Sequence, residues 1–395
     1  MMCDSAKSET EVPSTFMSLP VRSIYVHVPF CEHRCGYCDF SIIANRAELI
    51  PRYLNALRKE LETSPHLDSH LLDVDTLYIG GGTPTLLSAN ELEELFSILS
   101  DSFLLAPDAE FTIEANPDGL TADKIQVLKS VGVNRVSLGV QSFDDSRLIQ
   151  LERTHSVQQT ETAIELIQQN FNNFSLDLIF AIPGQTLSEW QQMLLKAISF
   201  QPPHISSYAL TYEKGTRFWS DRNKGNFQST DEQMEVEMYL KTISELTKAN
   251  YDHYEISNFA KAGSQSRHNN IYWSGRPYLA FGPGAASFVD GQRHSNHRSS
   301  FTWMNRLEQN QSPIVSTDDL TAEERARELL AIGLRRREGV NLDDLSLAAG
   351  VDLAVCCDDE ISNLIEKGWI HREFSELRIT SAGLLFADEI ASILV

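Results

Sequence analysis

The stretch Cys31-Glu-His-Arg-Cys35-Gly-Tyr-Cys38-Asp-Phe places three cysteines at C-x3-C-x2-C spacing directly after an apolar run. Thiolates this close in sequence can converge on one metal centre. A 4Fe-4S cluster held by only three cysteines keeps one iron open for an exchangeable ligand, as a reactive cluster requires. The alternative is a structural zinc ion closed by His27 or His33. Structural zinc motifs usually present two separated C-x2-C pairs, so the compact triplet favours the cluster.

Around this stretch, from Ser23 onward, short apolar runs alternate with longer amphipathic patterns. Such alternation is typical of a parallel sheet covered by helices. Six strand and helix repeats predict an α/β fold built on a partial parallel (βα)6-type barrel. An open doubly wound sheet is the alternative, but no glycine-rich dinucleotide motif follows the first strand. The predicted strands are residues 24–30, 75–80, 110–115, 135–140, 175–181 and 205–210. The predicted helices between them are residues 46–63, 89–100, 121–131, 157–170 and 187–200.

The chain divides into four predicted parts. Residues 1–20 are rich in Ser, Thr and Glu, lack the apolar segment of a signal peptide, and are expected to be a disordered leader. Residues 21–255 form the predicted barrel. Residues 256–315 are a connecting segment, irregular from 261 to 300, which we expect to lie against the barrel. Residues 316–395 predict a mainly helical, winged-helix-like domain with a small hairpin near residues 368–381.

Composition limits the class of function. The formal net charge of −22 over 395 residues disfavours nucleic acid as a partner, because such binding relies on lysine and arginine replacing counterions. Six cysteines make no disulfide framework in so long a chain, and three free thiolates need a reducing compartment, so the predicted location is cytoplasmic. No apolar run reaches about eighteen residues, the length of a membrane-spanning helix. Peripheral membrane contact is compatible with this composition.

Polar side chains recur near the ends of the predicted strands. Glu114, Gln141 and Asp177 each interrupt or close an apolar strand, and Gly80-Gly-Gly-Thr-Pro-Thr85 follows another strand directly. In parallel α/β barrels the carboxyl ends of the strands form the rim where sites are assembled. A single buried carboxyl group is usually only a satisfied structural group. Several at equivalent strand ends, together with the cysteine loop, predict a site at this rim.

Six motifs occur in a fixed order along the chain. They are Tyr25-Val-His-Val-Pro-Phe-Cys31, the cysteine triplet, Gly80-Gly-Gly-Thr-Pro-Thr85, Ile113-Glu114, Gly139-Val-Gln141-Ser-Phe143 and Asp177-Leu-Ile-Phe-Ala-Ile-Pro-Gly184. From about residue 23 to the C-terminus, the chain resembles the radical SAM proteins of the oxygen-independent coproporphyrinogen III oxidase family. The triplet alone marks the radical SAM superfamily, whereas the ordered set is specific to this branch.

The resemblance implies a set of cofactor ligands. Cys31, Cys35 and Cys38 hold the 4Fe-4S cluster, whose open iron binds the amino and carboxylate groups of S-adenosylmethionine, and an electron donor reduces the cluster. Glycines at residues 80–82 let backbone groups approach that ligand closely. For Arg153, the alternative is a solvated surface arginine. The implied S-adenosylmethionine contacts are Tyr25, Tyr37, Gly81, Gly82, Thr83, Glu114, Gln141, Arg153 and Asp177.

Two branches of this family differ in sequence. The porphyrinogen oxidases carry a further cysteine two residues after the third ligand, where this chain has Phe40, and they have a longer N-terminal extension. The chain instead is similar to the haem chaperone branch, whose H-N-x-x-Y-W motif matches residues 268–273. This resemblance implies haem contacts from His268, Asn269, Tyr272 and Trp273.

The haem contacts have a chemical rationale and a plainer alternative. A neutral imidazole is a good axial ligand for haem iron, and Tyr and Trp offer flat apolar surface. The alternative is that these side chains only anchor a glycine-rich loop to the core. His27 is a further candidate for the tetrapyrrole, although a strand histidine facing the core is the plainer interpretation.

The resemblance therefore predicts a haem chaperone that binds haem and transfers it to apo-haemoproteins. A homodimer is compatible with the same resemblance. The alternative is an enzyme, an oxygen-independent coproporphyrinogen III oxidase that carries out radical oxidative decarboxylation. A radical RNA-modifying enzyme is poorly supported, because the chain is acidic and has no appended basic domain.

Overall fold

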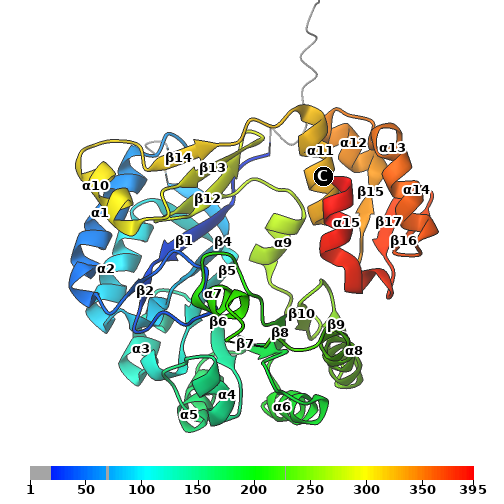
Figure 1. Ribbon diagram of the computed structural model, residues 1–395. Helices are drawn as coiled ribbons and strands as arrows, with labels where there is room; N and C mark the ends of the chain where they lie inside the picture. Colours follow the sequence, from blue (N-terminus) through cyan, green and yellow to red (C-terminus); the bar gives the residue numbers. More distant parts are fainter. Residues whose placement is uncertain (1–18, 68–70, 227) are drawn as a thin grey trace, which may run out of the picture.

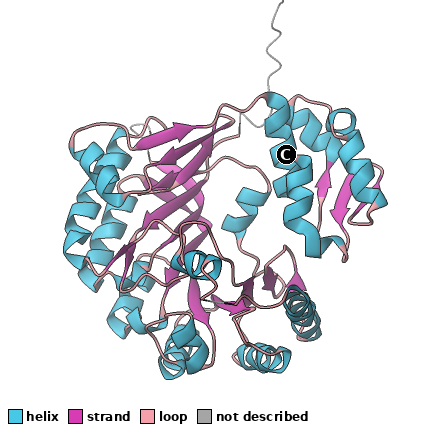
Figure 2. Ribbon diagram, in the orientation of Figure 1, coloured by secondary structure: helices cyan, strands magenta, loops and turns pink. Residues whose placement is uncertain are grey.

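The computed structural model describes residues 19–67, 71–226 and 228–395, so the predicted leader falls almost wholly outside the described residues. Six strands run parallel in chain order, and helices cover their outer side (Figures 1 and 2). The predicted partial (βα)6 barrel is confirmed. The six strands are β1 (Ser23–Val28), β4 (Leu72–Gly81), β5 (Phe103–Ala115), β6 (Arg135–Gln141), β7 (Asn173–Phe180) and β8 (His204–Ala209).

Local sequence explains where the covering helices begin. Ser88, Ser156 and Thr186 each cap a helix, and the third residue of that helix, Glu or Gln, bonds back to the cap. This reciprocal arrangement satisfies two backbone donors that a helix start otherwise leaves unpaired. The barrel helices are α1 (Ile50–Thr63), α2 (Ala89–Ser100), α3 (Ala122–Ser130), α4 (Asp145–Gln150), α5 (Val157–Gln168), α6 (Leu187–Ser199), α7 (Arg217–Asn223) and α8 (Glu232–Lys248).

The segment between the barrel and the C-terminal domain is regular, so the prediction of an irregular stretch was wrong. β11 pairs parallel with β1 and extends that edge of the sheet, whereas β10 pairs antiparallel with β8 and, at its other side, with β9. Strands of three to five residues between glycines leave no periodic signal in the sequence. The elements are β9 (Asp252–His253), β10 (Asn258–Ala260), α9 (Arg267–Trp273), β11 (Leu279–Phe281), β12 (Ala286–Val289), β13 (Gln292–Asn296), α10 (Ser300–Glu308) and β14 (Ile314–Thr317).

The C-terminal domain has its own hydrophobic core, which includes Leu330, Leu353, Leu364 and Leu377. The predicted helical, winged-helix-like fold is confirmed, and a third strand, β15, joins the predicted hairpin. Within the described residues, no helix has the length and apolar character needed to span a membrane. The elements are α11 (Ala322–Gly333), β15 (Val340–Asn341), α12 (Leu342–Ala349), α13 (Leu353–Cys356), α14 (Asp358–Glu366), β16 (Ile370–Glu373), β17 (Glu376–Ile379) and α15 (Ala387–Leu394).

Helix α11 joins the two parts of the molecule. It contacts α9 near the open side of the barrel, and Arg325 of α11 lies over the ring of Phe288 from β12 at 5.1 Å. Tyr239 and Ile243 of α8 also pack against the C-terminal core. Figure 1 shows α9 between the barrel sheet and the C-terminal domain. One face of α11 is therefore part of the wall around the barrel opening.

Candidate functional site

The cysteine loop leaves the carboxyl end of β1, as predicted. Its two ends are clamped together because β2 (Phe30–Cys31) pairs with β3 (Ile43–Ala44). The backbone N–H of Asn45 donates to the Cys31 carbonyl at 2.9 Å, and that of Cys38 donates to the Cys35 carbonyl at 3.1 Å. The middle of the loop is fixed by α7, since the N–H of Phe218 donates to the carbonyl of Gly36 at 2.9 Å. The three thiols are thus carried on a short, anchored turn.

The thiols have few protein partners and are suited to a soft metal centre. Cys31 Sγ lies 3.7 Å from Thr83 Oγ1, and Cys35 Sγ lies 3.9 Å from Arg153 Nη1. Burial raises the pKa of Cys31 to about 12 and also raises the pKa of Cys38, and the neighbouring thiols add to both effects. Bound iron would supply the positive charge that keeps such buried thiols ionised. Three sulfur donors of this kind fit a 4Fe-4S cluster.

The alternative zinc site is not formed. In the described part of the chain, no three His, Cys, Asp or Glu side chains are spaced to hold one metal ion. Both ring nitrogens of His27 are engaged, Nδ1 with Tyr25 Oη at 3.0 Å and Nε2 with the Ser41 carbonyl at 2.7 Å. His33 faces Glu152, with 3.6 Å between Nε2 and Oε2. With His27 and His33 engaged elsewhere, neither histidine is placed to complete a three-cysteine zinc shell in this structure.

The glycine turn after β4 faces a buried carboxyl group. Glu114 accepts hydrogen bonds from the N–H of Gly81 at 2.9 Å and from Tyr78 Oη at 2.8 Å. Burial raises the pKa of Glu114 to about 7. Because a single nearby cation would favour its charged form, this carboxylate is suited to an ammonium or hydroxyl group of a ligand.

Gly82 brings the same turn against the cysteine loop. A Cβ atom at this position would lie 2.5 Å from the carbonyl oxygen of Phe30 and 3.0 Å from Cys31 Sγ. Gly81 has φ +115°, a conformation that side chains rarely adopt. The glycines therefore permit a close backbone approach between the turn after β4 and the thiol loop, whereas their close approach to a ligand stays a prediction.

Arg153 connects the thiol loop to the neighbouring strand ends. Its Nη2 donates to Asn116 Oδ1 at 2.6 Å and to the carbonyl of Gly139 at 3.4 Å, while Nη1 approaches Cys35 Sγ. The side chain is half-buried, and its Nε has no hydrogen-bond partner. Arg153 is therefore not a solvated surface arginine. Asn116 was missed by the sequence analysis, although it follows the end of β5 directly.

The remaining residues predicted to contact S-adenosylmethionine lie around the same opening. Tyr37 packs against Phe218 with ring centroids 6.2 Å apart, and Gln141 is the last residue of β6. Asp177 accepts from Ser137 Oγ at 2.9 Å and from Ser175 Oγ at 3.0 Å, and burial raises its pKa. Asp177 is in the interior of β7, so it lies deeper in the barrel than the other strand-end groups.

The predicted haem residues on α9 divide into two pairs. His268 is 1% exposed, and its ring nitrogens meet Thr76 Oγ1 at 2.9 Å and Tyr272 Oη at 2.7 Å. Burial lowers the pKa of His268 to about 3. With both nitrogens engaged, His268 anchors α9 to the sheet, as the alternative interpretation expected. Asn269 donates its N–H to Ser266 and lies outside the cavity described next, whereas Tyr272 and Trp273 line that cavity.

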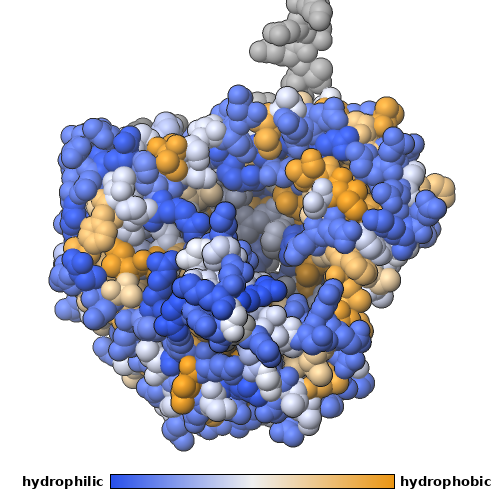
Figure 3. All heavy atoms as spheres, in the orientation of Figure 1, coloured by the Kyte–Doolittle hydropathy of each residue, from blue (hydrophilic) through white to orange (hydrophobic). Residues whose placement is uncertain are grey.

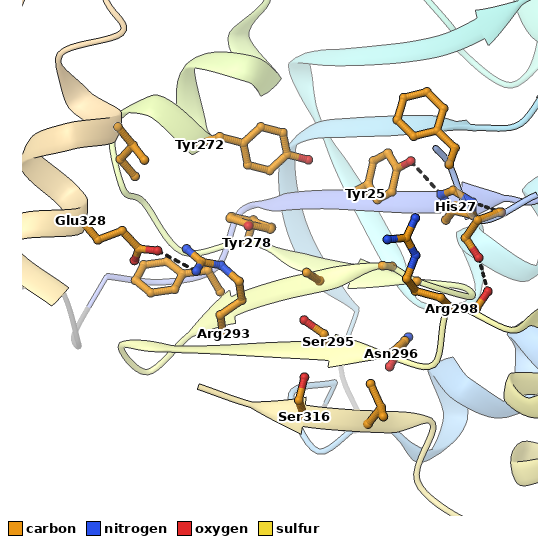
Figure 4. A pocket seen from close by; sticks show the side chains of 18 of the residues that line it. Tyr25, His27, Tyr272, Tyr278, Arg293, Ser295, Asn296, Arg298, Ser316 and Glu328 are labelled. Carbon is orange, nitrogen blue, oxygen red and sulfur yellow. Dashed lines mark hydrogen bonds and ion pairs between the residues drawn. The ribbon is translucent and has the colours of Figure 1, made fainter. Parts of the chain in front are cut away.

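A cavity of about 680 Å³ opens beside the end of the cysteine loop. Figure 3 shows a hollow between the barrel and the C-terminal domain, and Figure 4 shows the cavity walls from β1, α9, the β12–β14 sheet and α11. Phe40 is 63% exposed at this cavity. Arg293 pairs with Glu328 at 2.7 Å and Arg298 pairs with Asp39 at 3.1 Å. The aromatic lining residues are Tyr25, Phe40, Tyr272, Trp273, Tyr278 and Phe288.

A buried carboxyl group holds one wall of this cavity. Glu60 of α1 accepts from the N–H of Gly282 at 2.8 Å and from Asn296 Nδ2 at 2.6 Å, and Asn296 lines the cavity. Glu60 is 5% exposed, and burial raises its pKa from 4.5 to about 7. The group therefore ties α1 to the strand β13 while retaining a proton near neutral pH.

We expect Glu60→Gln to change the pH dependence of stability. Because the pKa of Glu60 is higher in the folded than in the unfolded protein, the folded protein binds more protons between pH 4.5 and about pH 7. The contribution of Glu60 to the free energy of unfolding therefore falls as pH rises through that range. Glutamine cannot titrate and does not lose this contribution. The difference in free energy of unfolding between the variant and wild type should therefore shift by about 3 kcal/mol in favour of the variant when pH is raised from about 5 to 8. Urea unfolding at both pH values measures this. The exposed neighbour Glu62→Gln is the control, and parallel pH profiles for Glu60→Gln and wild type would contradict the assignment.

Comparisons with known proteins agree with this geometry. The sequence model of the Radical SAM superfamily matches residues 25–197, and that of the HemN C-terminal domain matches residues 320–386. The chain is 37% identical to the heme chaperone HemW of Bacillus subtilis over 94% of this chain and 98% of that protein. It is 37% identical to the heme chaperone HemW of Escherichia coli over 70% of this chain and 73% of that protein.

More distant likeness extends to an animal protein and to a solved structure. The mouse radical S-adenosyl methionine domain-containing protein 1, mitochondrial, is 30% identical over 93% of this chain and 86% of its own length. The structure of the Escherichia coli coproporphyrinogen III oxidase HemN superposes with a TM-score of 0.84 over 96% of this chain and 91% of that chain. At 21% identity, that structural likeness establishes the fold only. The sequence relatives establish more: the chain belongs to the HemW family of the radical SAM superfamily.

Proposed function

We propose that this protein is a haem chaperone, which holds haem in the aromatic cavity and delivers it to apo-haemoproteins. We also propose that it carries a 4Fe-4S cluster and S-adenosylmethionine at the adjoining barrel rim. The observation that carries the proposal is the cavity itself. Its aromatic walls begin at Asp39 and Phe40, directly after the third cysteine of the triplet. Flat, apolar surface is what a macrocycle needs, and the HemW relatives are named as haem chaperones.

At the rim, the chain's residues would have distinct tasks. Cys31, Cys35 and Cys38 would hold the cluster, which when bound supplies single electrons and an open iron site. The Glu114 carboxylate suits the ammonium or ribose hydroxyls of S-adenosylmethionine, and the Arg153 guanidinium suits its carboxylate. Gly81 and Gly82 let the turn after β4 pack directly against His27 and the thiol loop, where any side chain would clash.

In the cavity, charge and shape both suit haem. Tyr25, Trp273 and Phe288 line the cavity with aromatic side chains that suit a planar ligand, and Arg293 and Arg298 offer cations to its propionates. Arg293 and Arg298 are at present paired with Glu328 and Asp39, so propionates would compete with those carboxylates. Because Glu328 belongs to α11, displacement of this helix would open the cavity for transfer.

The decisive experiment is a haem titration of anaerobically reconstituted, cluster-loaded protein. We expect stoichiometric haem binding, passage of that haem to an added apo-haemoprotein, and no consumption of coproporphyrinogen III. Turnover of coproporphyrinogen without stable haem binding would favour the oxidase and refute the chaperone. Haem that binds but never leaves for the apo-protein would contradict the transfer step.

The cavity assignment has its own test in Trp273→Ala. Loss of a large aromatic wall should weaken haem binding by about tenfold, because such a ring contributes about 1–1.5 kcal/mol beyond its buried area. The matched control is Trp369→Ala, which removes a tryptophan stacked on Phe386 in the C-terminal domain. Equal haem affinities in the two variants would place the haem site elsewhere.

A further inference from the structure

We propose that Tyr272 is the residue that binds the iron of ferric haem in this cavity, as a phenolate, and that His268 is a positioning residue that hydrogen-bonds the bound oxygen. This inference rests on the proposed haem site. Phenolate ligation of ferric haem is known chemistry, although histidine is the commoner ligand. The hydrogen bonds around the cavity decide between a tyrosine and a histidine as the iron ligand.

No imidazole lone pair faces the cavity. His27 is the only histidine among its described lining residues. Its Nε2 meets a backbone carbonyl, which can only accept, so Nε2 must carry the hydrogen and Nδ1 must accept from Tyr25 Oη. His268 lies behind Tyr272 with both nitrogens engaged. Ligation by either histidine would break a buried hydrogen bond, at a cost of about 1–3 kcal/mol.

His268 can donate to a phenolate, and His27 cannot. The Nδ1 of His268 meets the hydroxyl of Thr76, which is able either to donate or to accept. If Thr76 donates to Nδ1, then Nε2 carries the hydrogen and donates to the Tyr272 oxygen at 2.7 Å. The imidazole stays neutral throughout, so no charge is buried on it. A phenolate at Tyr25 would instead face the lone pair of His27 Nδ1, which is repulsive.

The step is balanced without an added oxidant or reductant. The O–H bond of Tyr272 breaks, its proton leaves to solvent, and the phenolate oxygen bonds to ferric iron, whose oxidation state does not change. Figure 4 shows the ring of Tyr272 extending into the cavity toward Tyr25, so its oxygen lies on the ligand side of α9. The hydroxyl proton of Tyr272 is the only one lost.

Tyr278 is the competing oxygen ligand. It lines the same cavity, and its ring centroid is 4.6 Å from that of Tyr272. The cation next to it, Arg293, already pairs with Glu328 and Asp318. The same guanidinium also hydrogen-bonds the Tyr278 hydroxyl and lowers its pKa against the effect of burial, so Tyr278→Phe must be compared directly with Tyr272→Phe.

The test compares Tyr272→Phe with Tyr278→Phe, the competing ligand, and with the control Tyr251→Phe. In wild type the Tyr251 hydroxyl donates to the Pro202 carbonyl in the barrel core, away from the cavity. Ferric haem is added to each cluster-loaded protein. Optical titration gives affinity, and resonance Raman and electron paramagnetic resonance report the axial ligand. We expect tyrosinate vibrations with high-spin ferric iron in wild type and Tyr251→Phe. In Tyr272→Phe we expect these signals to disappear. Haem should still bind to this variant, but with an affinity at least tenfold lower than in wild type.

His268→Gln adds a readout that a purely structural role would not change. Its amide can still donate to the Tyr272 oxygen, so tyrosinate signals should persist at shifted frequency, whereas His268→Phe should lose them. Thermal unfolding of each variant checks folding. An imidazole signature in wild type, or loss of the tyrosinate signal only in Tyr278→Phe, overturns this inference and leaves the chaperone proposal intact. Absence of haem binding in wild type overturns the chaperone proposal instead.

Discussion

Cys35→Ser is expected to leave the purified, reconstituted protein with almost no bound iron or sulfide. Cys35 is one of three thiols on a turn whose ends are clamped by β2 and β3. A serine hydroxyl is a hard donor that ionises far less readily than a thiol, so a cluster with only two thiolates would be lost during purification. Iron and sulfide analysis, together with the visible absorbance of the cluster, measures the effect.

The chain offers a matched control for this experiment in Cys356→Ser. Cys356 is a partly exposed thiol in the C-terminal domain, with its sulfur 3.7 Å from that of Cys357. Wild type and Cys356→Ser should both bind about four irons per chain, as a 4Fe-4S cluster requires. Wild-type protein that retains one zinc and no iron would refute the cluster, and so would Cys35→Ser protein with a full iron content.

The sequence was most informative where one local pattern determines one element. Alternating apolar runs predicted all six parallel strands of the barrel. Helix α2 has the predicted bounds, and it begins at Ala89 because Ser88 and Glu91 form its capping box. The thiol loop was expected at the carboxyl end of the first strand because its position in the chain requires this. These features depend on neighbours in sequence.

Features that depend on distant partners were not predictable. β11 has only three residues and becomes a strand by pairing with β1, more than 250 positions earlier in the chain. His268 was interpreted as a candidate iron ligand, but Thr76 and Tyr272 occupy its two nitrogens, and Thr76 comes from β4, far from α9 in the sequence. Asn116 joins the site because Thr83 and Arg153, both distant in sequence, contact its side-chain amide. The sequence motifs thus identified residues that lie close together in the fold. The chemical role of each side chain depends on its hydrogen-bond partners, which the motifs do not reveal.

The position of α11 suggests how the two proposed sites communicate. Leu329 and Ile332 line the cavity, and Glu328 of the same helix pairs with Arg293 across it. The opposite wall ends at Asp39 to Ser41, which immediately follow Cys38. A change at the cluster loop therefore has a direct structural route to the cavity, without passing through the barrel core.

We expect Arg153→Gln to weaken S-adenosylmethionine binding by about a hundredfold. A charged hydrogen bond to a carboxylate contributes about 1.5–3 kcal/mol, and the buried Nε of Arg153 has no protein partner and is free for a ligand. Glutamine keeps a polar amide but carries no charge, and it is too short to make the contact with Asn116 that the guanidinium makes. Equilibrium binding of S-adenosylmethionine to cluster-loaded protein under anaerobic conditions measures the loss.

Arg22→Gln controls for the loss of one positive charge. Arg22, directly before β1, pairs with Asp75 of β4, and a partly exposed pair of this kind has little effect on binding elsewhere. Iron content must be measured alongside, because Arg153 also lies 3.9 Å from Cys35 Sγ. If Arg153→Gln keeps its full iron content and its S-adenosylmethionine affinity, then Arg153 only holds Asn116 and the thiol loop together. If Arg153→Gln loses iron as well, Asn116→Ala decides between binding the ligand and holding the thiol loop. Asn116→Ala frees the guanidinium without removing its charge. Retained iron together with tight S-adenosylmethionine binding in Asn116→Ala would show that the charge of Arg153 acts on the ligand.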